Sequence, residues 1–184
     1  MFKDFIDNEK YLTDKFTGHK YLDTYNEVLS SRKDSTKNVL EIGVSAGGSI
    51  LLWRDFFQNA NIYGIDIDDK PQSLINDSMT RISFIKQNAY DVNFVQSNFI
   101  DKNIRFDLIV DDGPHSLESM KFFAEHYSRI LNNGGVLVIE DIPSIDWCPQ
   151  IINHFSESLR NKARVVDLRP IQNRWDDIMI VYEP

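Results

Sequence analysis

The stretch FDLIVDDGPHSLESMKFFAEHYSRIL, residues 106–131, combines two patterns that decide the fold class. Residues 106–112 form a short apolar run that ends in two aspartates, which is typical of a buried strand. From 116 to 131 the apolar residues recur at the spacing of an amphipathic helix. A second apolar run, 136–141, follows two glycines and also ends in acidic residues. The stretch therefore predicts a strand, a helix and a second strand.

The same alternation of strands and helices continues on both sides of this unit. We expect further strands at 38–42, 61–67, 82–89, 163–169 and 177–184. Helices are expected at 50–58, in a short stretch after 91–94, and at 149–162. This alternation predicts an α/β fold in which a mostly parallel sheet is covered on both faces. The short connection between the last two strands makes that pair antiparallel.

Length and composition point to one globular domain. The 184 residues are enough for one domain with a core and short for two. We expect 1–37 to form a helical lead-in or lid and 38–184 to form the core of a single domain, 1–184. The net charge of −8 argues against a nucleic-acid backbone or an anionic membrane as the main partner. A lone cysteine and the lack of an apolar signal or membrane-spanning run favour a cytoplasmic protein.

A glycine-rich loop, VLEIGVSAGGS, separates the first expected strand from the first helix. Glycines let the backbone approach a ligand closely, and the helix amino end offers free N–H groups. The spacing Gly43-x-x-x-Gly47-Gly48 lacks the G-x-G-x-x-G pattern of dinucleotide binders. Glu41 would repel a phosphate but attract an ammonium or sulfonium group. Tight packing of strand against helix is the alternative explanation of these glycines.

Two further strand ends carry residues that suit a nucleoside. Asp66 ends the second expected strand, where an acidic side chain binds both hydroxyls of a ribose. Gln87 and Asn88 end the third, where they can meet the edge of an adenine. Together with the glycine loop, these positions describe an adenosine that carries a charged amino-acid tail.

At these residues the chain resembles the class I S-adenosylmethionine-dependent methyltransferases, over nearly its whole length. The motifs E-x-G-x-x-x-G-G (41–48), GID (64–66) and QNA (87–89) match that family's cofactor motifs. Within the family, TDKFTGHKYLDTY (13–25) and the pair DDGPH and IEDI are similar to the metal-dependent sugar O-methyltransferases of the macrocin and mycinamicin type, and to the cephalosporin hydroxylase-like group.

The resemblance implies a Rossmann-like sandwich with a seven-stranded sheet of order 3-2-1-4-5-7-6, whose seventh strand is antiparallel. It implies that 38–184 is a catalytic core with S-adenosyl-L-methionine bound over the first three strands. The expected cofactor-binding residues are Glu41, Gly43, Ser45, Gly47, Gly48, Asp66, Gln87, Asn88 and, facing the cofactor or anchoring its own turn, Asp111.

The resemblance also makes the fourth and fifth strands neighbours, so their acidic ends would meet. Asp112, Glu140 and Asp141 would then crowd one space, and hard oxygen ligands of this kind suit Mg²⁺ or Mn²⁺. Successive strand residues point to opposite faces, so Glu140 and Asp141 can share a metal only where the strand is ending. Pro143 makes such an ending credible. The alternative is two unrelated acidic strand ends.

His115 would stand beside this metal. A sugar hydroxyl is weakly acidic, and an adjacent imidazole can remove its proton as a general base. The alternative is a histidine at a helix start. By resemblance, Thr13, Asp14, Lys15, His19 and Tyr21 would close over the substrate; otherwise they belong to an exposed lead-in whose aromatic side chains pack on the core.

The expected function is thus S-adenosylmethionine-dependent, Mg²⁺-dependent O-methylation of a sugar or small natural product. A non-catalytic cofactor-binding module and a hydroxylase-like or aminopropyl-transferring enzyme on the same fold are the alternatives. No large insertion lies between the fifth strand and the final hairpin. The acceptor pocket would therefore be open, or completed by a second subunit of a homo-oligomer.

Overall fold

A computed structural model describes residues 1–74 and 80–184. Its centre is a seven-stranded sheet of order β3-β2-β1-β4-β5-β7-β6. The strands are β1 (Asn38–Ile42), β2 (Asn61–Asp66), β3 (Ile82–Lys86), β4 (Phe106–Asp111), β5 (Leu131–Ile139), β6 (Ala163–Asp167) and β7 (Ile178–Tyr182). β1 to β5 are parallel, whereas β7 runs antiparallel to both β5 and β6. The expected fold class and strand order are confirmed.

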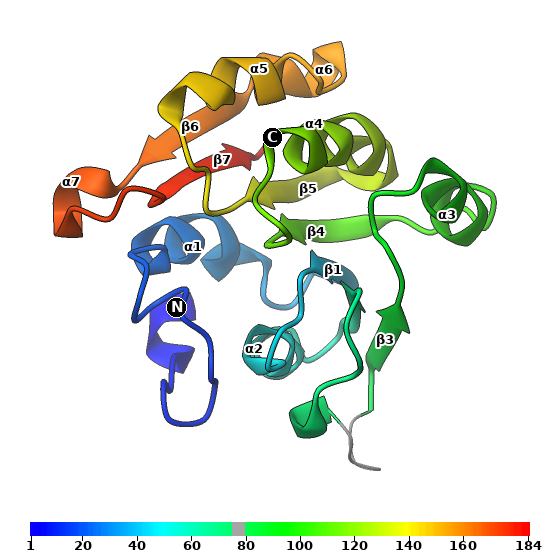
Figure 1. Cartoon of the computed structure of the whole chain (residues 1–184). Coiled ribbons are helices and arrows are strands. Elements are labelled where there is room, and N and C mark those ends of the chain that lie inside the picture. Colours follow the sequence, from blue (N-terminus) through cyan, green and yellow to red (C-terminus); the bar gives the residue numbers. More distant parts are fainter. Residues whose placement is uncertain (75–79) are drawn as a thin grey trace.

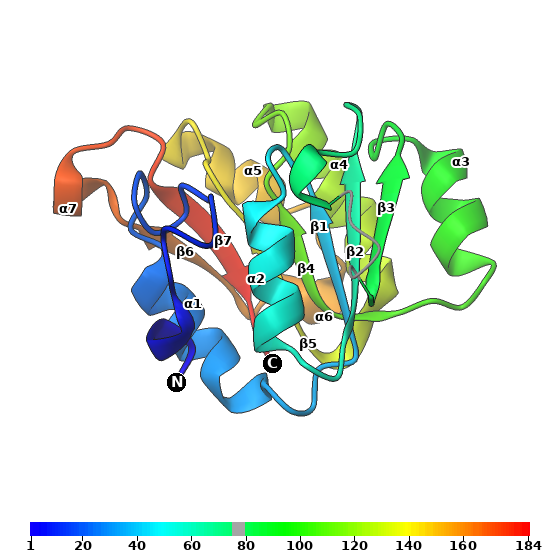
Figure 2. The same ribbon diagram turned by 90° about the horizontal axis from the view of Figure 1, so that it is seen from below.

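Helices cover both faces of the sheet (Figures 1 and 2). α1 (Leu22–Leu29) and α2 (Gly48–Phe56) pack on one face, and α4 (Leu117–His126) and α5 (Cys148–Ile152) pack on the other. Neighbouring strand residues alternate between the two cores: Leu108 belongs to the first and Ile109 to the second. A strand that is buried on both faces must be apolar at every position, which explains the continuous apolar runs of the sequence.

The shorter helices lie around this frame. They are α3 (Val92–Val95), α6 (Glu157–Arg160), α7 (Arg169–Gln172), the π-helix Gln96–Ile100, and the 3-10 helices Phe2–Phe5, Ser30–Arg32, Gln72–Leu74, Tyr127–Ile130 and Ile145–Trp147. α7 lies within the connection between β6 and β7. Among the residues described, no helix has the length and apolar character needed to cross a membrane.

Several expected boundaries differ from the structure. The single helix expected at 149–162 is two short helices, α5 and α6, because Ser156 takes an extended conformation (ψ 151°) and starts the second one. Ser and Asn side chains compete with helical hydrogen bonds, and Asn153 and Ser156 both lie in this turn. β5 begins at Leu131 instead of 136, where Leu131 pairs with Phe106 before a register shift. The helix before it accordingly ends at His126.

The amino-terminal segment, 1–37, lies against α2 and then crosses to the carboxyl ends of β4 and β5. Phe2 is fully buried and stacks on Trp53, with ring centroids 5.8 Å apart. Gly48 begins α2, and a Cβ on it would lie 2.1 Å from the carbonyl oxygen of Leu12. This close contact is one reason why the glycine loop contains a second adjacent glycine.

Candidate functional site

A cavity of about 860 Å³ opens at the carboxyl ends of β1, β2, β3 and β4. The sequence-predicted cofactor residues Gly43, Ser45, Gly48, Asp66, Gln87 and Asn88 line it. Thr13 and Asp14 of the amino-terminal segment line it as well, as do Asp112, His115 and Asp141. The structure therefore brings the glycine loop, two acidic strand ends and part of the lead-in segment around one space.

Asp66 is held in place by the glycine loop. Its Oδ2 accepts hydrogen bonds from the backbone N–H groups of Val44 (2.7 Å) and Ser45 (3.0 Å). Burial alone would raise the pKa of Asp66, but the backbone donors around it bring the pKa below its ordinary value. The carboxylate therefore stays ionised, as a side chain that accepts hydrogen bonds from ribose hydroxyls must be.

Gly43 lets the glycine loop contact the turn after β4. Its φ is +84°, and a Cβ at this position would lie 1.8 Å from the carbonyl oxygen of Asp112. The N–H of Asp112 in turn donates to the carbonyl of Ile42 at 2.8 Å. One glycine thus sets the distance between the cofactor loop and the acidic turn.

The acidic ends of β4 and β5 meet at the edge of the cavity. His115 Nε2 lies 3.3 Å from Asp112 Oδ1 and 3.8 Å from Asp141 Oδ2. One ligand atom from each of these three residues lies within 4.8 Å of the others. His115 and Asp141 both have a φ of 53°. Strand geometry has ended at Asp141, which removes the difficulty that successive strand side chains point to opposite faces.

The ionisation of His115 follows from these neighbours. Burial opposes the charged imidazolium, but the hydrogen bond to Asp112 and the charges of Asp141 and Asp112 outweigh it. The pKa of His115 is therefore raised above its ordinary value.

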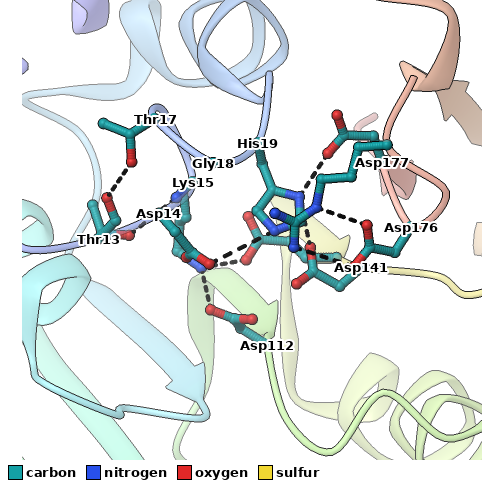
Figure 3. Close-up of polar contacts among 12 residues, drawn as sticks. Thr13, Asp14, Lys15, Thr17, Gly18, His19, Asp112, Asp141, Asp176 and Asp177 are labelled. Carbon is teal, nitrogen blue, oxygen red and sulfur yellow. Dashed lines mark hydrogen bonds and ion pairs between the residues drawn. The ribbon is translucent and has the colours of Figure 1, made fainter. Parts of the chain in front are cut away.

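Glu140, the third predicted metal ligand, is directed toward the interior. It is 1% exposed, its Oε1 accepts a hydrogen bond from the Tyr25 hydroxyl at 2.8 Å, and its Oε2 contacts the ammonium of Lys15. Lys15 also pairs with Asp112 Oδ2 at 2.5 Å (Figure 3). Glu140 therefore does not line the cavity. It is linked to Asp112 through the Lys15 ammonium, which contacts both carboxylates.

Lys15, predicted to contact substrate, does not line the cavity. Its Nζ lies among Asp112, Glu140 and Glu41, with Glu41 Oε1 at 3.1 Å. Burial would lower the pKa of Lys15, but the three carboxylates raise it well above its ordinary value. The ammonium therefore stays charged inside the protein.

Three predicted cofactor-binding residues do not line the cavity. Glu41 is fully buried and accepts a hydrogen bond from Trp53 Nε1 at 2.9 Å. Asp111 accepts one from the Tyr90 hydroxyl at 2.5 Å, and burial raises its pKa to about 7. Tyr90 itself lines the cavity, whereas Glu41 and Asp111 do not. Gly47, with a φ of 84°, is the N-cap of α2 and also lies outside the lining.

The remaining residues of the amino-terminal motif fix Asp141 from behind. The Tyr21 hydroxyl donates to Asp141 Oδ1. His19 stacks on Tyr21 with ring centroids 4.7 Å apart, and its Nδ1 lies 2.6 Å from Asp177 Oδ1 (Figure 3). His19 and Tyr21 are 1% exposed and do not line the cavity.

Sequence reasoning missed three residues here: Tyr25, Tyr90 and Asp177. Tyr25 lies within the quoted motif 13–25, which was the available signal for it. Tyr90 follows the QNA motif directly. Asp177 precedes β7 and carried no signal, because its partner His19 lies 158 residues away in the sequence.

The cavity is acidic. Five aspartates line it, namely Asp14, Asp66, Asp68, Asp112 and Asp141, and its lining within the described parts of the chain includes no lysine or arginine. Such a lining favours cations and uncharged hydroxyl groups over anions.

The family model described as "Methyltransferase domain" matches residues 40–142. The mycinamicin VI 2''-O-methyltransferase of Micromonospora griseorubida is 31% identical over 153 residues, which cover 76% of this chain and 36% of that protein. The 8-demethyl-8-alpha-L-rhamnosyl tetracenomycin-C 2'-O-methyltransferase of Streptomyces olivaceus is 29% identical over 143 residues, covering 73% and 36%. The chain thus spans about a third of the length of these relatives.

Among solved structures, the fold matches that of the MycE methyltransferase from the mycinamycin biosynthetic pathway, in complex with Mg, SAH and mycinamycin VI. The TM-score is 0.74 at 22% sequence identity, and the match covers 99% of this chain and 53% of that one. This likeness confirms the fold.

Proposed function

The chain belongs to the methyltransferase domain family, and from this premise we propose that it transfers a methyl group from S-adenosyl-L-methionine to a hydroxyl of a sugar or another small natural product. The observation that carries the proposal is the meeting of Asp112, Asp141 and His115 at the edge of the cavity that the glycine loop lines. The names of the relatives, which are sugar O-methyltransferases, support the same reaction class.

We assign the cofactor to the part of the cavity lined by Gly43, Ser45, Gly48, Asp66 and the Gln87–Asn88 pair. The ionised Asp66 would bind the ribose hydroxyls. Glu41, Gly47 and Asp111 would shape this site from behind its wall. When bound, the cofactor supplies a methyl group on a positively charged sulfur.

The residues at the cavity edge fit a divalent cation, Mg²⁺ or Mn²⁺. Asp112 and Asp141 each direct one oxygen toward His115 while a protein donor, Lys15 or Tyr21, holds the other. Burial raises the pKa of Asp141, and the nearby charge of Asp112 adds to this rise, so a bound cation would favour the ionised form of Asp141. Asp112 and Asp141 would hold the cation, which would stabilise negative charge on the acceptor oxygen. Glu140, the third predicted ligand, would support Asp112 from the interior through the Lys15 ammonium that both carboxylates contact.

His115 is the proposed general base. It lines the cavity, is about one-third exposed, and lies beside the acidic pair. It would take the proton from the acceptor hydroxyl as the oxygen forms its bond to the methyl carbon and the carbon–sulfur bond breaks. Thr13 and Asp14 line the same cavity and would contact the acceptor. Residues 1–37 would then belong to one catalytic domain with 38–184. The acceptor side of the cavity would be open, so that a second subunit of a homo-oligomer could complete it.

Calorimetry with S-adenosylhomocysteine, with and without Mg²⁺ and with NAD as the control ligand, tests the cofactor assignment. Binding of the homocysteine product and not of NAD is expected. A failure of both ligands to bind would contradict the cofactor site.

The variants Asp112→Asn and His115→Asn test the reaction. We expect each to reduce methylation of a neutral glycoside by about 10²- to 10⁴-fold while leaving affinity for S-adenosylhomocysteine within about threefold. His154→Asn, at an exposed histidine far along the chain, is the matched control and should keep full turnover. Full turnover in Asp112→Asn would refute the cation site. Product binding without any methylation in the unmodified protein would favour a non-catalytic cofactor-binding module.

A further inference from the structure

Lys15 is buried more deeply than any other lysine or arginine in the described parts of the chain. It is 1% exposed, and no other lysine or arginine there is classed as buried. Its ammonium pairs with Asp112 Oδ2 at 2.5 Å, with Glu41 Oε1 at 3.1 Å and with Glu140. Glu41 is the next-to-last residue of β1, and Asp112 and Glu140 directly follow β4 and β5. Lys15 comes from the amino-terminal segment, and Figure 3 shows it beside Asp112.

The carboxylates around Lys15 have the spacing of metal ligands. One oxygen from each of Glu41, Asp112 and Glu140 lies within 4.8 Å of the others. Glu41 Oε1 is buried and faces the ammonium at 3.1 Å. Glu41 and Glu140 are buried and Asp112 is 25% exposed, and three carboxylates this close together are costly unless a cation neutralises them. The ammonium therefore stands where a cation is required.

Asp112 belongs to this cluster and to the cavity edge at once. Its Oδ2 contacts Lys15, and its Oδ1 lies 3.3 Å from His115 Nε2. Two adjacent cation positions therefore share the Asp112 carboxylate: one oxygen faces the inner position and the other faces the outer position. The inner position is filled by the ammonium, and the outer position opens to the cavity.

We propose that Lys15 is a built-in cation that fills the inner of two adjacent cation positions, so that the acidic cluster takes one divalent ion and not two. This inference rests on the proposed function for the outer position. It makes Lys15 a positioning residue, which holds Asp112 and Glu140, and not a group that touches the acceptor.

The variant Lys15→Met tests the inference, because it removes the ammonium and keeps the apolar stem. Mn²⁺ alone is the probe, and its stoichiometry is measured by electron paramagnetic resonance and calorimetry on the full chain. We expect one Mn²⁺ per chain in the unmodified protein and two in Lys15→Met. We also expect Mn²⁺ to raise the Tm of the variant by several degrees more than that of the unmodified protein, since the ion replaces a lost internal charge.

Lys10→Met is the matched control. Lys10 lies in the same segment and pairs with a carboxylate, Asp55 at 2.9 Å, but its side chain is 55% exposed. The Lys10→Met variant should bind one Mn²⁺ per chain, and Mn²⁺ should raise its Tm by the same amount as that of the unmodified protein. Equal stoichiometry and equal increments in Lys15→Met and the unmodified protein would overturn the inference.

The numbers separate the two hypotheses. No Mn²⁺ in the unmodified protein and one in Lys15→Met would refute the proposed outer site and support the role of Lys15. One ion in each would support the outer site and refute the role of Lys15.

Should Lys15→Met fail to fold without metal, refolding it in Mn²⁺ gives the same test. Recovery of the folded state by Mn²⁺ supports the inference. The double variant Lys15→Met/Glu41→Gln, which loses one buried charge of each sign, completes this test. The inference is overturned if Mn²⁺ does not restore folding of Lys15→Met while the double variant folds and binds only one ion with the affinity of the unmodified protein.

Discussion

At the scale of single residues, three non-glycine residues with strained backbone conformations lie at the cavity. Ser45, His115 and Asp141 line it, and all three have positive φ (44°, 53° and 53°). Such conformations cost on the order of 1 kcal/mol or more for residues other than glycine and persist only where the surroundings enforce them. Here they turn side chains out of the strand alternation and toward one space, which is how Asp141 comes to face His115.

Gly43 provides a direct test of this close packing. Gly43→Ala adds a Cβ where the carbonyl of Asp112 lies 1.8 Å away and where φ is already +84°. We expect a loss of roughly 2–5 kcal/mol in the free energy of unfolding, combining left-handed strain with overpacking. Urea denaturation measures it, and S-adenosylhomocysteine affinity should fall with it.

The control for this substitution is Gly134→Ala. Gly134 has nearly the same φ, +87°, but a Cβ there meets nothing within 4 Å. It should therefore lose only the strain, about 1–2 kcal/mol. Equal losses at the two glycines would show that the contact with Asp112 does not matter.

At the scale of elements, the amino-terminal segment is anchored on α2 before it reaches the site. Phe2 packs on Trp53 and Phe56, while Tyr11 donates a hydrogen bond to Asp55 Oδ2 at 3.0 Å. These contacts place the following residues, including Lys15, over the strand ends. The position of the buried ammonium thus depends on packing against a helix that contributes no carboxylate to it.

The Asp55 contact predicts a pH dependence of stability. Burial opposes ionisation of Asp55, but hydrogen bonds from Arg54, Lys10 and Tyr11 outweigh it and bring its pKa to about 2. A carboxyl whose pKa is lower in the folded state stabilises the protein above its unfolded pKa, near 4, and loses this contribution as pH falls toward 2. We expect Asp55→Asn to be about 1 kcal/mol less stable than the unmodified protein at pH 7.

Chemical denaturation at several pH values checks this prediction. The difference between the two proteins should shrink as pH falls from about 4 to about 2. Asp34→Asn, at an exposed aspartate, should stay near the unmodified stability at pH 7. A difference for Asp55→Asn that does not change over this range would refute the contribution of its ionised form.

At the scale of the whole molecule, charge is distributed so that the cavity repels anions. The net charge is −8, and five aspartates line the cavity. The nearby cations are already engaged: Lys15 is enclosed by carboxylates, and Arg174 pairs with Asp176 at 2.7 Å. The negative electrostatic potential at the cavity mouth therefore disfavours negatively charged acceptors, in addition to the effect of the aspartates in the lining.

This distribution predicts acceptor preference. A neutral glycoside should be methylated with a kcat/KM at least about tenfold higher than that of its phosphorylated counterpart, because the phosphate meets like charge and finds no basic side chain in the described lining. Added salt should narrow the gap, since it screens the exposed part of the field. Equal kcat/KM values at low salt would refute this charge selection.

Much of the fold and part of the site could be predicted from local pattern. Apart from β5, which begins five residues before its predicted start, the strands were predicted close to their observed ranges because each is an apolar run bounded by turn residues. The helix expected at 149–162 was wrong, since apolar spacing continues across the turn at Asn153 and Ser156. The strand order came from family resemblance, because periodicity contains no information on which strands pair.

The sequence by itself determined the α/β class, the glycine loop and the acidic residues at strand ends, because these depend on residue type and spacing over a few positions. Only the tertiary structure decided that Lys15 lies among Glu41, Asp112 and Glu140, and that His19 pairs with Asp177. Lys15 and Asp112 are 97 residues apart, and Lys15 and Glu140 are 125 apart. Contacts of this range depend on where the amino-terminal segment crosses the sheet, which is set by the packing of Phe2 and Tyr11 on α2 and not by any local pattern.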